Sequence, residues 1–185
     1  MRKLIASVFL SLDGMVSSQN GDVGWVINSF NDQMGKYAGD LMESMDTILL
    51  GRVTYEIMTR HWPFQTEETS PGAEKMNSTP KVVFSRTLKK AEWGTYDNAT
   101  LVKDKAAEEI VRLKAQPGKN MVIYGSAKLV QGLTELKLID EYQLLVHPVL
   151  LGQGKPLFGG QAANLKLLRA ETFTNNVVVL YYKVG

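Results

Sequence analysis

In three short segments of the chain, an apolar run is followed directly by glycine, serine or arginine. They are LLGRVTYE at 49–56, VVFSRT at 82–87 and VIYGSAK at 122–128. In the first segment Gly51 has no side chain, Arg52 carries a positive charge and Thr54 adds a hydroxyl group. This combination suits a phosphate where a strand ends and a helix begins, because the free N–H groups of the helix point at the ligand. Anion binding is therefore the chemistry that these residues indicate.

Each segment also has a simpler interpretation as an ordinary turn. Gly51 could make a bend with Arg52 in solvent, and Arg86 could be a solvated residue at a strand end. Three segments of one composition at one sheet edge together favour an extended ligand with several phosphates, such as a dinucleotide. The sequence has neither G-x-G-x-x-G after its first strand nor G-x-x-x-x-G-K-[ST], so neither phosphate-binding fingerprint applies.

Composition limits the classes of protein to consider. With 185 residues and 44% hydrophobic content, the chain can bury one ordinary core, which predicts a single domain over residues 1–185. The net charge of +2 is too small to provide the positive electrostatic field that binds nucleic acid. No stretch approaches the roughly 20 apolar residues that are needed to span a bilayer. The chain has no cysteine and two histidines far apart, so we expect no disulfide and no metal site. A cytoplasmic protein is the expectation.

The elements that must position the three segments follow from hydrophobic spacing. Extended runs predict strands at 3–12, 47–50, 81–84, 100–102, 120–124 and 141–147. Helical spacing predicts helices at 31–45, 52–61, 105–114 and 127–136, and residues 65–79 are the most loop-like, with one helical turn at 73–77. Residues 165–173 and 177–183 form an expected antiparallel hairpin. The alternation of strands and helices predicts an α/β fold.

At these residues the chain resembles the dihydrofolate reductase superfamily, and more closely its branch with the reductase domain of bacterial riboflavin biosynthesis. The resemblance lies in SLDG at 11–14, Trp25, TILLGRVTYE at 47–56, VVFSRT at 82–87 and the run from 122 to 158. It implies a three-layer fold with a mixed, mainly parallel central sheet of about eight strands, flanking helices and an antiparallel C-terminal hairpin. It also implies NADPH bound in extended form across the three segments.

The resemblance assigns roles to particular residues. Gly51, Arg52 and Thr54 would contact the cofactor's phosphates, and Ser85 and Arg86 would contact its adenosine side with the 2′-phosphate. The remaining contacts expected for the cofactor are Gly125, Ser126 and Ala127 at the central phosphates, and Ala6 on the first strand. The substrate pocket would contain Ser7, Trp25 and Asp32.

Two departures from the family pattern bear on the substrate. The third segment has Tyr124 before Gly125 and Ser126 after it, where dihydrofolate reductases have adjacent glycines. Phe30 stands where the folate enzymes have an acid, and the nearest candidate, Asp32, is displaced by about two positions, which weakens folate as the substrate. Asp32 could protonate the acceptor or bind the N–H groups of a heterocycle; alternatively, it could simply interact favourably with the helix dipole.

The expected function is NADPH-dependent hydride transfer to a small heterocyclic substrate, most like that of 5-amino-6-(5-phosphoribosylamino)uracil reductase. One alternative is a true dihydrofolate reductase, and another is a nucleotide-binding module without catalysis. The apolar C-terminal hairpin makes a homodimer a reasonable expectation. His147, before Pro148, is interpreted as a strand-end residue, and Asp13 as a turn residue.

Overall fold

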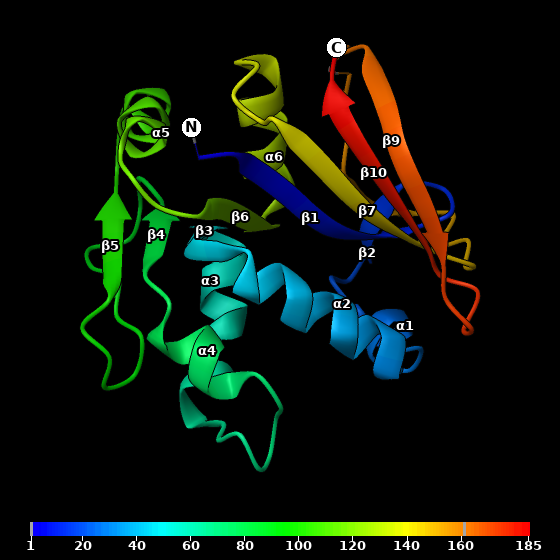
Figure 1. Ribbon diagram of the computed structural model, residues 1–185, viewed down its shortest axis with the longest axis horizontal. Helices are drawn as coiled ribbons and strands as arrows, with labels where there is room; N and C mark the ends of the chain where they lie inside the picture. Colours follow the sequence, from blue (N-terminus) through cyan, green and yellow to red (C-terminus); the bar gives the residue numbers. More distant parts are fainter. Residues whose placement is uncertain (1, 161) are drawn as a thin grey trace.

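The computed structural model describes residues 2–160 and 162–185, and its centre is an eight-stranded sheet in the order β5-β4-β3-β6-β1-β7-β10-β9 (Figure 1). The strands are β1 (Leu4–Ser11), β3 (Met45–Gly51), β4 (Lys81–Phe84), β5 (Ala99–Val102), β6 (Asn120–Gly125), β7 (Glu141–His147), β9 (Leu165–Thr172) and β10 (Val178–Val184). A separate small sheet pairs β2 (Met15–Ser18) with β8 (Gly154–Pro156).

Strand direction divides the main sheet into two parts. Neighbouring strands from β5 through β7 are parallel, whereas β10 runs antiparallel to both β7 and β9. In Figure 1 the β9–β10 hairpin forms one end of the sheet and β5 the other. The prediction of a mixed, mainly parallel sheet of about eight strands with an antiparallel C-terminal hairpin is confirmed.

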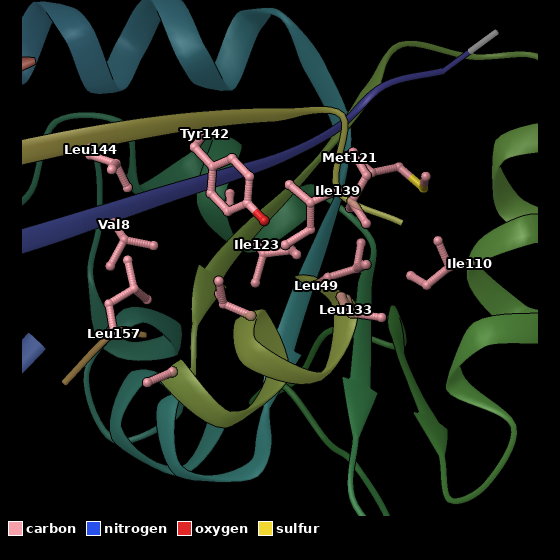
Figure 2. Close-up of a cluster of buried hydrophobic side chains, with 14 of the residues drawn as sticks. Val8, Leu49, Ile110, Met121, Ile123, Leu133, Ile139, Tyr142, Leu144 and Leu157 are labelled. Atoms are coloured by element: carbon pink, nitrogen blue, oxygen red, sulfur yellow. The ribbon is translucent and has the colours of Figure 1, made fainter. Parts of the chain in front are cut away.

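Helices cover both faces of the sheet. On one face lie α5 (Ala106–Ala115) and α6 (Ala127–Glu135); on the other lie α2 (Asp32–Glu43), α3 (Arg52–Met58) and α4 (Ala73–Ser78). The period-2 alternation of β1 supplies both layers, because Leu4 and Val8 pack toward α5 and α6 whereas Ile5 packs toward α2 and α3. Figure 2 shows the first of these layers, in which Tyr142 and Ile123 lie above the helix that carries Leu133.

A third apolar cluster lies under the start of α2 and the short helix α1 (Gly24–Ile27). Val26 and Met34 pack there against Phe173 and Val179, from the C-terminal hairpin and its turn. The side chains of Thr174 and Asn175 also hydrogen-bond this region, since the Asn175 amide donates to Ser29 O at 2.6 Å. The C-terminal hairpin therefore holds α1 and the beginning of α2 in place. The methionines of α2, Met34 and Met42, are buried in the core.

Two boundaries differ from the sequence-based expectation. The helix expected to reach His61 ends at Met58, because the hydroxyl of Thr59 bonds the carbonyl of Tyr55 at 3.0 Å and a 3₁₀ turn with Pro63 follows. Residues 13–30, where hydrophobic spacing predicted neither strand nor helix, contain β2 and α1. The pairing of β2 with β8, more than a hundred residues away, leaves no local pattern in the sequence.

Candidate functional site

The three segments with glycine, serine and arginine meet at one edge of the sheet. The adjacent parallel strands β4, β3 and β6 end at Phe84, Gly51 and Gly125. The carboxyl ends of parallel strands share an edge, and ligands of open α/β sheets bind outside that edge. The clustering that the sequence predicted is therefore confirmed.

The first and third segments are in direct contact at this edge. A Cβ atom placed on Gly51 would collide with the hydroxyl of Ser126 and would lie 3.0 Å from its backbone nitrogen. A Cβ atom on Gly125 would lie 2.6 Å from Thr54 Oγ1. Gly51 has φ of −78°, which any residue adopts, so closeness to Ser126 and not a bend explains the glycine. Gly125 has φ of +138°, and the peptide bond between it and Ser126 is cis.

Two helix N-termini open at this contact. Helix α6 has Ser126 as its N-cap in an extended conformation, and the Ser126 side chain makes no capping hydrogen bond. Helix α3 has Gly51 as its N-cap, which has no side chain to offer. Neither N-cap residue therefore supplies a side-chain acceptor to the N–H groups of its helix start, which leaves those groups available to an anion such as phosphate. Because Gly51 has no side chain, its backbone can approach Ser126 closely, and the starts of α3 and α6 therefore lie next to each other.

Two arginines flank the pair of helix starts. Arg52 donates to both carboxylate oxygens of Glu56 at 3.0 and 2.9 Å, and the Arg86 guanidinium lies 3.3 Å from Asp104. The Arg86 side chain is 83% exposed. Exposed ion pairs of this kind contribute little to stability, so either guanidinium can turn to an anionic ligand at small cost. The charge that phosphate binding requires is thus present.

Ser85 has a structural explanation in its own turn. It is buried, and its hydroxyl accepts hydrogen bonds from the backbone nitrogens of Thr87 at 3.2 Å and Leu88 at 3.1 Å. These bonds fix the turn that leaves Arg86 facing solvent. Ala127 begins α6, with its side chain in the core, so its contribution to a ligand would come from the backbone.

The residues expected around the substrate lie on β1, α1 and α2. Ser7 faces α2, and its hydroxyl lies 2.9 Å from the hydroxyl of Tyr37. Ala6 is fully buried on the opposite face, so only its backbone could contact a ligand on the α2 side. Asp32 is exposed in the first turn of α2, where Asn31 is the N-cap and accepts from Met34 N at 3.0 Å.

Sequence reasoning missed a chain of hydrogen bonds that includes Ser7. The Tyr37 hydroxyl donates to Gln143 Oε1 at 2.7 Å, and the Gln143 amide donates to Glu141 at 2.8 Å. Burial raises the pKa of Tyr37 above its ordinary value, so this hydroxyl remains a donor. Tyr37 and Gln143 also line a hollow of about 480 Å³ between α2 and the C-terminal hairpin. Period-2 spacing alone places Ser7 and Gln143 on strands but cannot pair them with Tyr37.

Asp13 does more than make a turn. Its carboxylate accepts hydrogen bonds from Gly152 N at 2.7 Å, Leu151 N at 3.2 Å and the hydroxyl of Ser11 at 2.6 Å. These bonds lower the pKa of Asp13, with the Ser11 hydroxyl the largest cause. Asp13 therefore ties the end of β1 to the loop after β7.

Residues 2–160 and 162–185 offer no candidate metal site and no candidate membrane-spanning helix. No group of three or more His, Asp or Glu side chains there could hold a metal ion. None of the helices in these ranges is long and apolar enough to cross a membrane.

The comparison with protein families identifies the chain. The model of the RibD C-terminal domain matches residues 2–179. The chain belongs to this family. Among curated proteins, the uncharacterized protein YyaP of Bacillus subtilis (strain 168) is 36% identical over 98% of this chain and 94% of its own length.

Solved structures share the fold of this RibD C-terminal domain protein. A protein of Shewanella sp. PV-4, named for riboflavin biosynthesis, is 26% identical with a TM-score of 0.79 and covers 99% of both chains. A Thermotoga maritima diaminohydroxyphosphoribosylaminopyrimidine deaminase/5-amino-6-(5-phosphoribosylamino)uracil reductase is 16% identical, with a TM-score of 0.73 over 100% of this chain and 57% of its own. A dihydrofolate reductase from Enterococcus faecalis, complexed with NADP(H), is 13% identical with a TM-score of 0.64 over 99% and 96%. The fold is therefore dihydrofolate reductase-like.

Proposed function

We propose that this protein is an NADPH-dependent reductase that transfers a hydride to a small heterocyclic substrate, most like 5-amino-6-(5-phosphoribosylamino)uracil. The observation that carries the proposal is the contact between Gly51 and Ser126, which brings two uncapped helix starts together beside Arg52 and Arg86. Membership of the RibD C-terminal domain family supports a reductase. The same fold in a dihydrofolate reductase complexed with NADP(H) supports the choice of cofactor.

The residues at the sheet edge fit such a cofactor. The N–H groups at the starts of α3 and α6 would hold its phosphates, and Arg52 would neutralise their charge. Arg86 would pair with the 2′-phosphate by exchanging its exposed contact with Asp104. When bound, the nicotinamide supplies the hydride. The protein's own task is to hold the acceptor in place and to exclude water.

The substrate would lie between β1, α1 and the beginning of α2. The carbon of its C=N or C=O group would receive the hydride, and the nitrogen or oxygen would receive a proton. Asp32 is our proposed source of that proton, or the acceptor for the heterocycle's N–H groups, because it is the acid at the start of α2. Ser7 and Trp25 would line the same pocket. A cytoplasmic location is part of this proposal.

A two-step titration tests the function. Purified protein is titrated with NADPH while tryptophan fluorescence is followed, and then 5-amino-6-(5-phosphoribosylamino)uracil and dihydrofolate are added separately while oxidation of the cofactor is recorded. We expect NADPH to bind and the pyrimidine to be reduced. No binding of NADPH would reject the cofactor assignment. Oxidation by dihydrofolate alone would establish the folate alternative, and binding without oxidation by either compound would favour a nucleotide-binding module.

A further inference from the structure

Trp25 and His147 are two rings in contact whose polar atoms have no partners. Trp25 Nε1 and His147 Nε2 are both buried and lack a hydrogen bond within the described part of the chain. The rings meet edge to face, with their centroids 4.9 Å apart and their planes at 83°. Buried polar atoms in native proteins are nearly always paired, so two unpaired atoms on touching side chains mark a place where a bound molecule would complete their hydrogen bonding.

The two atoms offer complementary hydrogen-bonding groups. His147 Nδ1 lies 3.0 Å from the carbonyl oxygen of Leu145, and a carbonyl only accepts, so the ring proton is on Nδ1 and Nε2 is an acceptor. Burial lowers the pKa of His147, and the lowered pKa favours the neutral ring. The carbonyls of Leu145 and Leu10 offset part of this lowering. Trp25 Nε1–H can only donate. The pair therefore presents one donor and one acceptor.

The pair lies at the same edge of the sheet as the phosphate-binding residues. His147 ends β7 and pairs with Ser11, the last residue of the parallel strand β1. Phe9 packs against the His147 ring at 5.8 Å and is 37% exposed, and Trp25 is partly exposed. The two unpaired atoms thus lie just below an accessible, aromatic part of the surface. A flat heterocycle suits that surface.

We propose that Trp25 and His147 together recognise a cyclic amide edge of the heterocyclic substrate. Trp25 Nε1–H donates to a ring carbonyl, and His147 Nε2 accepts from the adjacent ring N–H. Both atoms are closed to solvent in this structure, so the substrate reaches them by displacing α1, a single turn that is held by the Asp22 carboxylate at Gly24 N and by the Asn175 amide at Ser29 O. This inference rests on the proposed function and makes His147 a specificity-determining residue.

The recognition is selective because of what an incorrect ligand leaves unpaired. A heterocycle that keeps its carbonyls but has no ring N–H would leave His147 Nε2 buried without a partner. Sites built to pair a ligand's N–H or O–H group discriminate strongly against analogues that lack it. The expected preference is about tenfold, which corresponds to one hydrogen bond.

Binding of two probes tests the inference without requiring turnover. The probes are 5,6-diaminouracil and its 1,3-dimethyl derivative, which keeps both carbonyls and has no ring N–H. Their affinities are measured by calorimetry on the NADPH-saturated full chain, for wild type, His147→Phe and Trp25→Phe. The Phe variants keep an aromatic ring in the contact and remove its polar atoms; His147→Phe also removes the Nδ1 contact with Leu145 O, and Trp25→Phe makes the side chain smaller. Trp62→Phe, in the 3₁₀ turn, is the matched control. Thermal unfolding confirms that each variant is folded.

We expect wild type and Trp62→Phe to bind 5,6-diaminouracil about tenfold more tightly than the dimethyl derivative. His147→Phe should bind both probes equally, and Trp25→Phe should weaken both because the carbonyl contact is common to them. A preference that survives in His147→Phe, or its absence from wild type, would overturn the inference. NADPH binding is titrated separately and tests the proposed function. If NADPH binds but the probes show no preference, the proposed function stands and the recognition by Trp25 and His147 is rejected.

Discussion

Gly51 and Ser126 approach so closely that no side chain fits on Gly51, although they lie in different strand-to-helix segments. The backbone angles of Gly51 would accept any residue, so the glycine is required by the neighbour and not by the turn. In the proposed function, this closeness lets the starts of α3 and α6 bind one cofactor together. A change at Gly51 should therefore affect stability and cofactor binding together.

Gly51→Ala is expected to reduce the free energy of unfolding by about 1–3 kcal/mol, as overpacking does in a filled site. It should also weaken NADPH binding, because Ser126 must move away from the start of α3. Urea denaturation and fluorescence titration measure the two effects. The control is Gly132→Ala inside α6, where an added Cβ meets nothing within 4 Å and should stabilise the helix by up to about 1 kcal/mol. Equal NADPH affinity in wild type and Gly51→Ala would contradict the assigned role.

Arg86→Ala should separate the two nicotinamide cofactors. Arg86 is exposed and its ion pair is with the exposed Asp104, so its removal is expected to leave the fold unchanged. Loss of a charge-assisted contact with the 2′-phosphate is expected to weaken NADPH binding about ten- to hundredfold and leave NADH nearly unchanged. Parallel titrations with both cofactors measure this. Arg112→Ala, which removes an arginine paired with Glu109 on α5, is the control. Similar losses for NADPH and NADH would show that Arg86 does not contact the 2′-phosphate.

Tyr37→Phe should show that the hydrogen-bond chain through Ser7 stabilises the fold. The change leaves the buried Ser7 hydroxyl and Gln143 carbonyl without their shared partner, and we expect about 1–3 kcal/mol of lost stability. Tyr182→Phe is the control, because the Tyr182 hydroxyl makes no hydrogen bond within residues 2–160 and 162–185. Chemical denaturation of both variants decides the matter. If the two variants are equally stable, the Tyr37 hydroxyl contributes nothing.

The sequence allowed the order of elements and the meeting of three segments to be predicted, because both follow from local spacing. The strand ends at Gly51, Phe84 and Gly125 are marked by apolar runs that stop, and parallel strands bring such ends to one edge. What the sequence could not supply were pairings between distant residues. The contact of Trp25 with His147 depends on α1 packing over the end of β7, and nothing in either local pattern indicates the other.

We propose that the outer strand β9 forms the interface of a homodimer. All eight of its residues are exposed, including three leucines, and its outer edge is unpaired among the described strands. An exposed apolar edge strand is a surface that another strand readily covers. We expect a dimer by light scattering and a monomer for Leu167→Glu. Val111→Glu, which changes an exposed apolar residue on α5, should remain a dimer. A wild-type protein that is monomeric at all concentrations would refute the expectation.

Lys81 should make stability rise with pH. Its ammonium group is buried at the start of β4, where it donates to Asn77 O at 2.6 Å and lies 4.3 Å from the centre of the Trp93 ring. Desolvation lowers the pKa of Lys81 from 10.5 to about 7. Between these values the unfolded chain binds a proton that the folded chain does not, so stability increases with pH, by at most about 1.4 kcal/mol per unit for one proton.

Lys81→Met removes this titration, and the difference in stability between wild type and variant should shift in favour of wild type from pH 7 to pH 10. Near pH 7 and below, the charge must be buried in the folded protein, so wild type bears the whole desolvation cost there. Urea denaturation at several pH values measures the slope. Lys183→Met, at an exposed position on β10, is the control and should follow wild type. Parallel curves for wild type and Lys81→Met would mean that Lys81 keeps its proton in the fold, held by the Asn77 carbonyl and the face of Trp93.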